Sequence, residues 1–278
     1  MLPQNRLNQI LNSIERLRPM PTNVSRILMM LDDPMTTASE ISEMVGLDQA
    51  LAALVLQFAN SATLGYGPVC SNLLVAVMRL GFRRIKTLLL GAAASGSLNN
   101  TLTGYRLGAG ALWNHSIATA MAAQWLARYL GYPDPEEAYV SGLLHDIGKL
   151  VLDQFVQVDY SRLIQSMSQS NLLLWQAEER MFGIDHSGVG GLMAKKWNFP
   201  PVLVEAIRYH HAPSLAMDNS RLAAIINIAN SAAVSEKYGS VDPHGHVIHP
   251  EAPRVLSIEN QTLDKLMSEL KTYLTTNN

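Results

Sequence analysis

Apolar residues recur at helical spacing along nearly the whole chain, and this periodicity limits its possible folds more than any other feature. No stretch shows a convincing alternation of apolar and polar residues bounded by the turns of a hairpin. The chain has 278 residues, 48% of them hydrophobic, which is enough for helices to bury a sizeable core. The sequence therefore predicts an all-α protein.

The predicted helices fall into two groups, joined by a softer segment, SLNNTLTGYRLGAG, near residue 105. After the second group comes a Gly- and Pro-rich loop, followed by an amphipathic helix over residues 261–274. We therefore expect an N-terminal helical half over residues 1–105, a second helical half over residues 106–235, and a loop with a C-terminal helix over residues 236–278.

Local signals predict where several helices begin and end. Thr37 and Glu40 have the spacing of a capping box that opens a helix. Residues 72–81 and 82–96 read as two helices, and the run TLGYGP before them reads as a turn. In the second half, we expect one helix to run through residues 136–152.

The stretch SGLLHDIGKL, residues 141–150, sets a histidine, an aspartate and a lysine into this otherwise apolar helix. Charged groups are costly to bury unless a partner, a proton or a metal compensates them. Residues three and four apart share a helix face, so Lys149 is predicted to lie beside Asp146 and His145. Gly142 and Gly148 flank these residues, although glycine inside a helix costs about 1 kcal/mol relative to alanine. We therefore expect another part of the chain to approach the backbone closely here.

Five of the eight histidines stand in or beside helices of the second half. They are His115, His145, His186, His210 and His211. Imidazole and carboxylate groups together suit a transition-metal ion such as iron, manganese or zinc better than calcium. Each histidine could alone be an ordinary core or helix-end residue, but together with Asp146 they favour a metal site.

Composition limits which partners the protein can bind and indicates its cellular compartment. A formal net charge of −2 and a pI near 6.4 give no basic surface for nucleic acid, which is an unlikely partner. The single cysteine, Cys70, cannot form an internal disulfide. The first residues lack the apolar region of a signal peptide, and no run approaches 18 consecutive apolar residues. We therefore expect a cytoplasmic protein that is not embedded in a membrane.

The chain resembles the HDOD domain proteins, a branch of the HD superfamily of metal-dependent phosphohydrolases. The resemblance covers roughly residues 5–235 and rests on the segments LRPMPTNVSRILMMLDDP, FANSATLGYGP, MRLGFRRIKTLLLG, WNHSIATAMAAQWLA, GLLHDIGKLVL, DHSGVGGLMAKKWNFP and AIRYHH. It implies a bacterial signal-transduction protein built as a helical HD-like bundle with an N-terminal helical subdomain. Many HDOD proteins are thought to have lost their metal ligands and to act as output or scaffold modules, so the resemblance alone does not imply an enzyme.

Comparison with the related HD-GYP branch implies which residues bind metal. One ion would take His115 and His145, and a second ion would take His186, His210 and His211. Asp146 would bridge the two ions. The aspartate that closes the family's site falls at Asn230, where an amide brings no charge, so the first ion should be held more weakly and one or two ions are expected. The run APSLAMDNS, after the histidine pair, differs from the DGSGYP-like run of cyclic-dinucleotide phosphodiesterases and argues against activity on cyclic di-GMP.

Two classes of function remain open from the sequence. As a metal-dependent phosphohydrolase, the protein would act on a phosphate ester or nucleotide, with Asp146 positioning the nucleophile and Lys149 neutralising charge on a phosphate oxygen. Only one of the seven predicted metal ligands is an anion, so the pocket would attract phosphate but hold metal less well. As a non-catalytic module, the protein would bind a signalling protein through its N-terminal helices, or a nucleotide without turnover.

Overall fold

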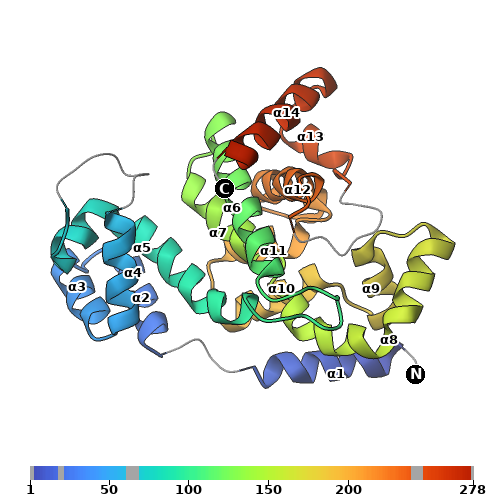
Figure 1. Cartoon of the computed structure of the whole chain (residues 1–278), viewed down its shortest axis with the longest axis horizontal. Helices are drawn as coiled ribbons and strands as arrows, with labels where there is room; N and C mark the ends of the chain where they lie inside the picture. Colours follow the sequence, from blue (N-terminus) through green and yellow to red (C-terminus); the bar gives the residue numbers. More distant parts are fainter. Residues whose placement is uncertain (1–2, 18–21, 61–68, 239–246, 277–278) are drawn as a thin grey trace. The chain divides into compact units, whose positions relative to one another are not determined.

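The protein is all-α, as its periodicity predicts. The structure, a computed structural model, describes residues 3–17, 22–60, 69–238 and 247–276 (Figure 1). Within these ranges there is no strand, and the extended pairing is limited to an isolated antiparallel bridge between Leu102 and Leu107. None of the described helices combines the length and the hydrophobicity needed to cross a membrane.

The chain divides into two compact units. The small unit comprises Arg18–Ser95, and the main unit comprises Met1–Leu17 and Gly96–Asn278. This division differs from the expected boundary near residue 105, and it assigns the first helix, α1 (Pro3–Glu15), to the main unit. Helix α1 packs on other helices of this unit. One of its contacts is an ion pair in which Arg6 Nη2 lies 2.7 Å from Asp159 Oδ2, both side chains being largely buried.

The small unit contains four helices among its described residues: α2 (Thr22–Asp32), α3 (Ala38–Gly46), α4 (Gln49–Ala59) and the first part of α5 (Leu73–Leu98). The capping box at the start of α3 is confirmed, since Thr37 and Glu40 each bond the other's backbone N–H. Gly81 interrupts α5 with φ +74°, which separates the two helical stretches expected there. The predicted turn at residues 63–68 lies outside the described residues.

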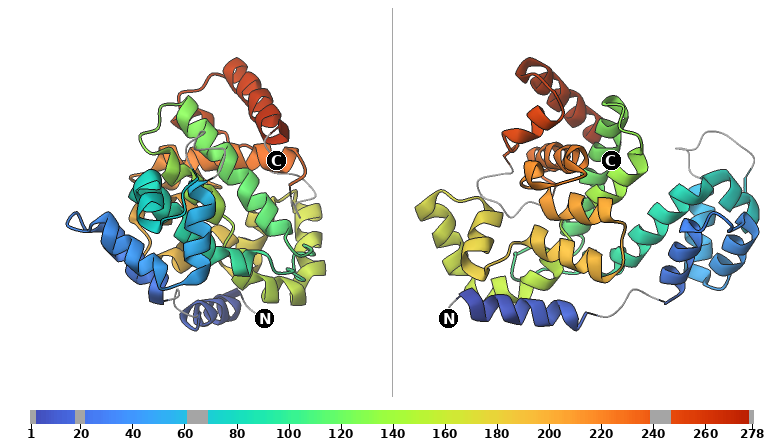
Figure 2. Two further views of the ribbon diagram at one scale, coloured as in Figure 1. Left: turned by 60° about the vertical axis from the view of Figure 1, so that its left-hand side comes forward. Right: turned by 180° about the vertical axis from the view of Figure 1, so that it is seen from behind.

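The main unit packs its remaining helices around a core rich in alanine. These helices are α6 (Ala111–Tyr129), α7 (Pro135–Leu144), α8 (Lys149–Ser170), α9 (Leu174–Phe182), α10 (His186–Lys196), α11 (Pro201–Tyr209), α12 (Ser220–Ser235), α13 (Glu251–Val255) and α14 (Asn260–Thr276). Helix α6 packs on α7 and α12, and α10 packs on α11 (Figures 1 and 2). The small side chains Ala118 and Ala122 of α6 are fully buried, which allows the neighbouring helices to approach closely.

The expectation of one helix through residues 136–152 is wrong. Helix α7 ends at Leu144, α8 begins at Lys149, and residues 145–148 form tight turns between them. The backbone bonds of these turns span three residues, as in Ile147 N–H to Leu144 O at 3.0 Å. The chain changes direction at this junction, so His145 and Asp146 lie where two helices meet.

Both glycines beside this junction lie against another backbone, as the sequence predicts. A Cβ atom on Gly142 would lie 2.8 Å from Ala120 Cα, so α7 and α6 touch there. A Cβ atom on Gly148 would collide with the carbonyl oxygen of His186 and lie 2.6 Å from Gly190 N, so the junction rests against the first turn of α10. These contacts hold the junction in place between two helices.

Gly148→Ala should destabilise the main unit, because the added methyl group meets backbone atoms that cannot rotate away. We expect a loss of about 1–3 kcal/mol in the free energy of unfolding, the usual range for an overpacked site, measured by urea denaturation. Gly108→Ala is the control, since nothing lies within 4 Å of a Cβ atom there, and its effect should stay within about 0.5 kcal/mol. Equal effects of the two substitutions would show that the close approach at Gly148 is not real.

Candidate metal centre

The predicted metal ligands come from five segments of the main unit. Helix α6 carries His115, and the junction of α7 and α8 carries His145 and Asp146. Helix α10 begins with His186, and His210 and His211 follow the end of α11. Helix α12 carries Asn230. Every one of these side chains is buried, with at most 8% of the residue exposed. Their burial raises the question of what compensates so many polar atoms in one place.

The first group of ligand atoms consists of His115 Nε2, His145 Nε2 and Asp146 Oδ2. The two imidazole nitrogens are 3.2 Å apart, and they lie 3.4 Å and 3.5 Å from the carboxylate oxygen. Ligand atoms of one ion with bonds of roughly 2.0–2.2 Å lie about 3.0–3.5 Å apart. The three atoms are therefore spaced as they would be around a single ion.

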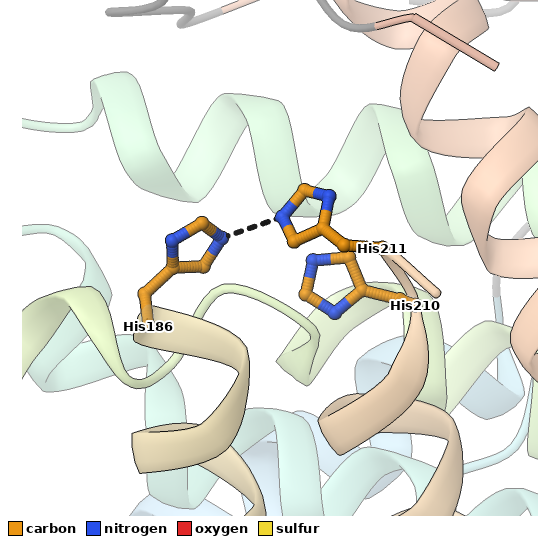
Figure 3. Close-up of side chains that lie close together, drawn as sticks. All are labelled: His186, His210 and His211. Atoms are coloured by element: carbon orange, nitrogen blue, oxygen red, sulfur yellow. Dashed lines mark hydrogen bonds between the residues drawn. The ribbon is translucent and has the colours of Figure 1, made fainter. Parts of the chain in front are cut away.

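The second group consists of His186, His210 and His211, whose rings face one another from the start of α10 and the end of α11 (Figure 3). Nε2 of His186 lies 2.9 Å from Nε2 of His211. Nε2 of His210 is buried and has no hydrogen-bond partner. One ligand atom from each residue lies within 4.8 Å of the other two, so this group could also hold an ion.

Asp146 connects the two groups. Its Oδ2 atom belongs to the first group, and its Oδ1 atom lies 3.1 Å from His186 Nε2 in the second. The carboxylate thus turns one oxygen toward each histidine group. Lys149 Nζ donates to the same Oδ2 atom at 2.6 Å, which confirms the predicted contact between Lys149 and Asp146.

Hydrogen bonds at Nδ1 fix the orientation of three of the imidazole rings. Nδ1 of His115 lies 2.9 Å from the carbonyl oxygen of Tyr238, and Nδ1 of His145 and of His210 lies 2.7 Å from a carbonyl oxygen three residues earlier. A carbonyl oxygen can only accept, so each Nδ1 must carry a proton, and in the neutral ring each Nε2 then presents a lone pair. This is the arrangement in which histidine binds a metal.

The Nε2 lone pairs test whether a metal ion fits this site. Nε2 of His115 and Nε2 of His145 would face each other at 3.2 Å as two acceptors, which is unfavourable unless a proton or a cation lies between them. Nε2 of His210 and Oδ1 of Asn230 are buried acceptors with no hydrogen-bond partner. A metal ion would satisfy such acceptors, so the residues of this site fit a metal ion.

Glu178 on α9 is a site residue that the sequence reasoning missed. Its Oε2 atom accepts from both the backbone N–H and Nδ1 of His186, at 2.9 Å and 2.6 Å, and its Oε1 atom accepts from the Tyr105 hydroxyl at 2.7 Å. The carboxylate is fully buried and adds a second anion beside the ligands. A signal was present, because Glu178 falls on the buried stripe of α9 with Leu174 and Ala177.

The charges of Asp146, His145 and His210 suit metal binding, whereas that of His186 opposes it. Burial alone would raise the pKa of Asp146, but His145 and Lys149 hold it well below its usual range. Burial lowers the pKa of His145 well below its usual value, and burial together with His186 lowers the pKa of His210 to about 3. Burial also opposes charge on His186, yet Glu178 and Asp146 outweigh it and raise its pKa to about 10. Near neutral pH, Asp146 is therefore anionic and His145 and His210 are neutral, as metal ligands must be. His186 is protonated in the metal-free protein and would release a proton on binding an ion.

Asn230 lies on the same face of α12 as Asn227. Three residues earlier, Asn227 donates from Nδ2 to the carbonyl oxygen of His210 at 2.8 Å, so this face of the helix is turned toward the histidines. Asn230 shares that face and is 3% exposed. Its unpaired Oδ1 is available as an additional ligand atom.

Comparisons with known proteins identify the family of the chain. The HDOD domain family model matches residues 17–213. A protein of Treponema pallidum is 27% identical over 203 residues, which are 73% of this chain and 39% of that protein, so the chain spans about two fifths of that relative.

Solved structures share the fold. An HDOD domain protein of unknown function from Geobacter sulfurreducens has a TM-score of 0.69 and 25% identity, covering 96% of this chain and 87% of the other. A protein from Shewanella amazonensis, provisionally named a phosphohydrolase, has a TM-score of 0.68 and 23% identity, covering 95% and 93% of the two chains.

Tyr105→Phe should destabilise the protein, because the buried Oε1 atom of Glu178 would lose its donor. We expect a loss of about 1–3 kcal/mol, the cost of one unsatisfied buried acceptor, measured by urea denaturation. Tyr129→Phe is the control, since Tyr129 is 50% exposed, and it should change stability by no more than about 0.5 kcal/mol. If both substitutions have the same small effect, the Tyr105–Glu178 bond does not stabilise this site.

Proposed function

This chain belongs to the HDOD domain family, and we propose that it is a signal-transduction protein whose main unit holds divalent transition-metal ions and hydrolyses a phosphate ester or nucleotide. The observation that carries the proposal is the carboxylate of Asp146, which has one oxygen near each group of histidines. The name of the related Shewanella amazonensis structure supports the same class of reaction.

The residues divide naturally between two ions of iron, manganese or zinc. His115, His145 and Asp146 Oδ2 would hold the first, with Asn230 Oδ1 as a further ligand. The second would be held by Asp146 Oδ1 together with His186, His210 and His211. Two bound ions about 3.5–4 Å apart would supply an activated water and stabilise both the attacking and the leaving oxygens of a phosphoryl group.

Asp146 and Lys149 are the proposed catalytic residues. Asp146 would fix the spacing of the two ion positions, because its two oxygens cannot move independently. Lys149 places a positive charge 2.6 Å from Asp146, where it would stabilise negative charge on a phosphate oxygen. Glu178 acts through His186 and is a positioning residue.

A second candidate function is a non-catalytic module that binds a signalling protein, or a nucleotide that it does not turn over. Two observations favour it. The predicted ligands are at most 8% exposed, so a substrate would have limited access to them. In addition, Asn230 brings no charge to the first ion position. Measured turnover decides between the two functions, because both predict bound metal.

The purified protein should contain about one to two equivalents of iron, manganese or zinc, measured by elemental analysis. His145→Ala together with Asp146→Ala should remove at least half of the bound metal, since the pair contributes to both ion positions. His249→Ala is the control, because His249 lies in a different segment and its Nδ1 accepts from Glu251 N–H. Metal-free wild type, or unchanged metal in the double variant, would contradict the proposed centre.

The same preparations, screened against phosphomonoesters, phosphodiesters and nucleotides, test for catalysis. The enzyme proposal predicts turnover that Asp146→Asn abolishes and Lys149→Met reduces by about a hundredfold to a thousandfold, the effect of removing one charge-stabilising group. Bound metal without turnover of any substrate class would favour the non-catalytic module.

Asn230→Asp should raise the metal affinity of the first ion position, because it adds a negative charge to a site of two imidazoles and one shared carboxylate. We expect at least a tenfold lower Kd in competition with a chromogenic chelator. Asn114→Asp is the matched control, since it adds the same charge on an exposed position of α6. An unchanged Kd in a folded Asn230→Asp variant would show that Asn230 does not face the ion.

A further inference from the structure

The main unit contains a second concave site beside the metal centre. It is a pocket of about 510 Å³ between α1, α9, α10 and α11. Small-molecule sites typically measure about 300–1,000 Å³. Its lining includes His211, which is the only one of the six candidate histidine and aspartate ligands found there.

The walls of the pocket suit a flat, apolar molecule. Leu7 and Leu11 from α1 and Leu192 from α10 supply aliphatic surface. Trp175 and Tyr209 supply aromatic rings. Aromatic side chains bind planar ring systems through stacking and edge contacts in addition to burying apolar area.

The charges of the pocket do not suit a phosphate. One guanidinium, that of Arg208, is outnumbered by the carboxylates of Glu179 and Asp185. Two of the N–H groups at the start of α10, which could otherwise bind an anion, already donate to carboxylates. Asp185 accepts from Gly188 N–H at 2.7 Å, and Glu178 accepts from His186 N–H at 2.9 Å. A ligand here should therefore carry no net negative charge.

A stacked pair of rings connects this pocket to the metal centre. The ring of Trp175 is nearly parallel to that of His211, with 5.6 Å between centroids and 10° between planes. Both rings line the pocket, and Nε2 of His211 lies 2.9 Å from Nε2 of His186. A molecule that shifts the Trp175–His211 pair would therefore shift a candidate ligand of the second ion.

We propose that this pocket binds an uncharged, flat heteroaromatic molecule such as a purine nucleoside, and that its occupancy is coupled to metal binding through the Trp175–His211 pair. The coupling rests on the proposed function, whereas binding in the pocket does not. The pocket is thus a ligand site separate from the phosphate position beside Lys149.

Calorimetric titration of the metal-free protein with adenosine tests the binding. We expect saturable binding that weakens at least tenfold in Leu192→Phe and in Leu215→Trp, because both substitutions fill the pocket. Leu215 is 63% exposed, so its substitution should not impair folding. Leu130→Phe is the matched control, a half-buried leucine in the core cluster of α6 and α12, and should bind as wild type does.

Adenosine 5′-monophosphate tests whether a negative charge on the ligand weakens its binding in the pocket. The metal-free protein should bind it more weakly than adenosine. Absence of adenosine binding, equal binding by the pocket variants and the control, or tighter binding of the monophosphate would each overturn the pocket proposal.

The coupling is tested by titrating Mn²⁺ with and without saturating adenosine. Linkage requires that adenosine changes the Mn²⁺ affinity by the same factor as Mn²⁺ changes the adenosine affinity. We expect a change of at least threefold, reduced in Trp175→Ala. Equal Mn²⁺ affinities with and without adenosine would overturn the coupling. A protein that binds adenosine but no Mn²⁺ would overturn the metal centre and its coupling while leaving the pocket.

Discussion

The site depends on how its histidines are held by their Nδ1 atoms. Backbone carbonyl oxygens fix the rings of His115, His145 and His210, so that their Nε2 lone pairs point into a buried space. Lone pairs confined together away from water are unfavourable without a cation or a proton. Asp146 is the anion that faces both histidine groups. The rest of the main unit holds the ligand atoms of the first group 3.2–3.5 Å apart.

Much of this could be predicted from local sequence. Helical periodicity indicated the fold class, and the capping box at Thr37 marked the start of α3. Helix spacing predicted the Lys149–Asp146 contact. Glycine inside an apolar helix indicated close backbone approach, and Gly142 and Gly148 both lie against other backbones. In each case the signal lies within a few residues of the feature that it predicts.

What could not be predicted depends on contacts between segments far apart in the sequence. The break in the helix at residues 145–148 arises where Gly148 rests against α10, and no proline marked it. Helix α1 packs on α8, α9 and α10 of the main unit, and its Arg6 pairs with Asp159, 153 residues later in the chain. The position of Glu178 on the buried stripe of α9 does not reveal its partners, because Tyr105 and His186 lie in other segments. Contacts of this kind between distant segments are only weakly indicated by a single sequence.

The most direct test of the central claim is a crystal structure of the protein grown with Mn²⁺ and measured at a wavelength where manganese scatters anomalously. We predict two anomalous peaks about 3.5–4 Å apart, one beside His115 and His145 and the other beside His186, His210 and His211, with one oxygen of Asp146 on each. A single peak in one of these groups would reduce the centre to one ion. Absence of any peak within bonding distance of these side chains would contradict the account.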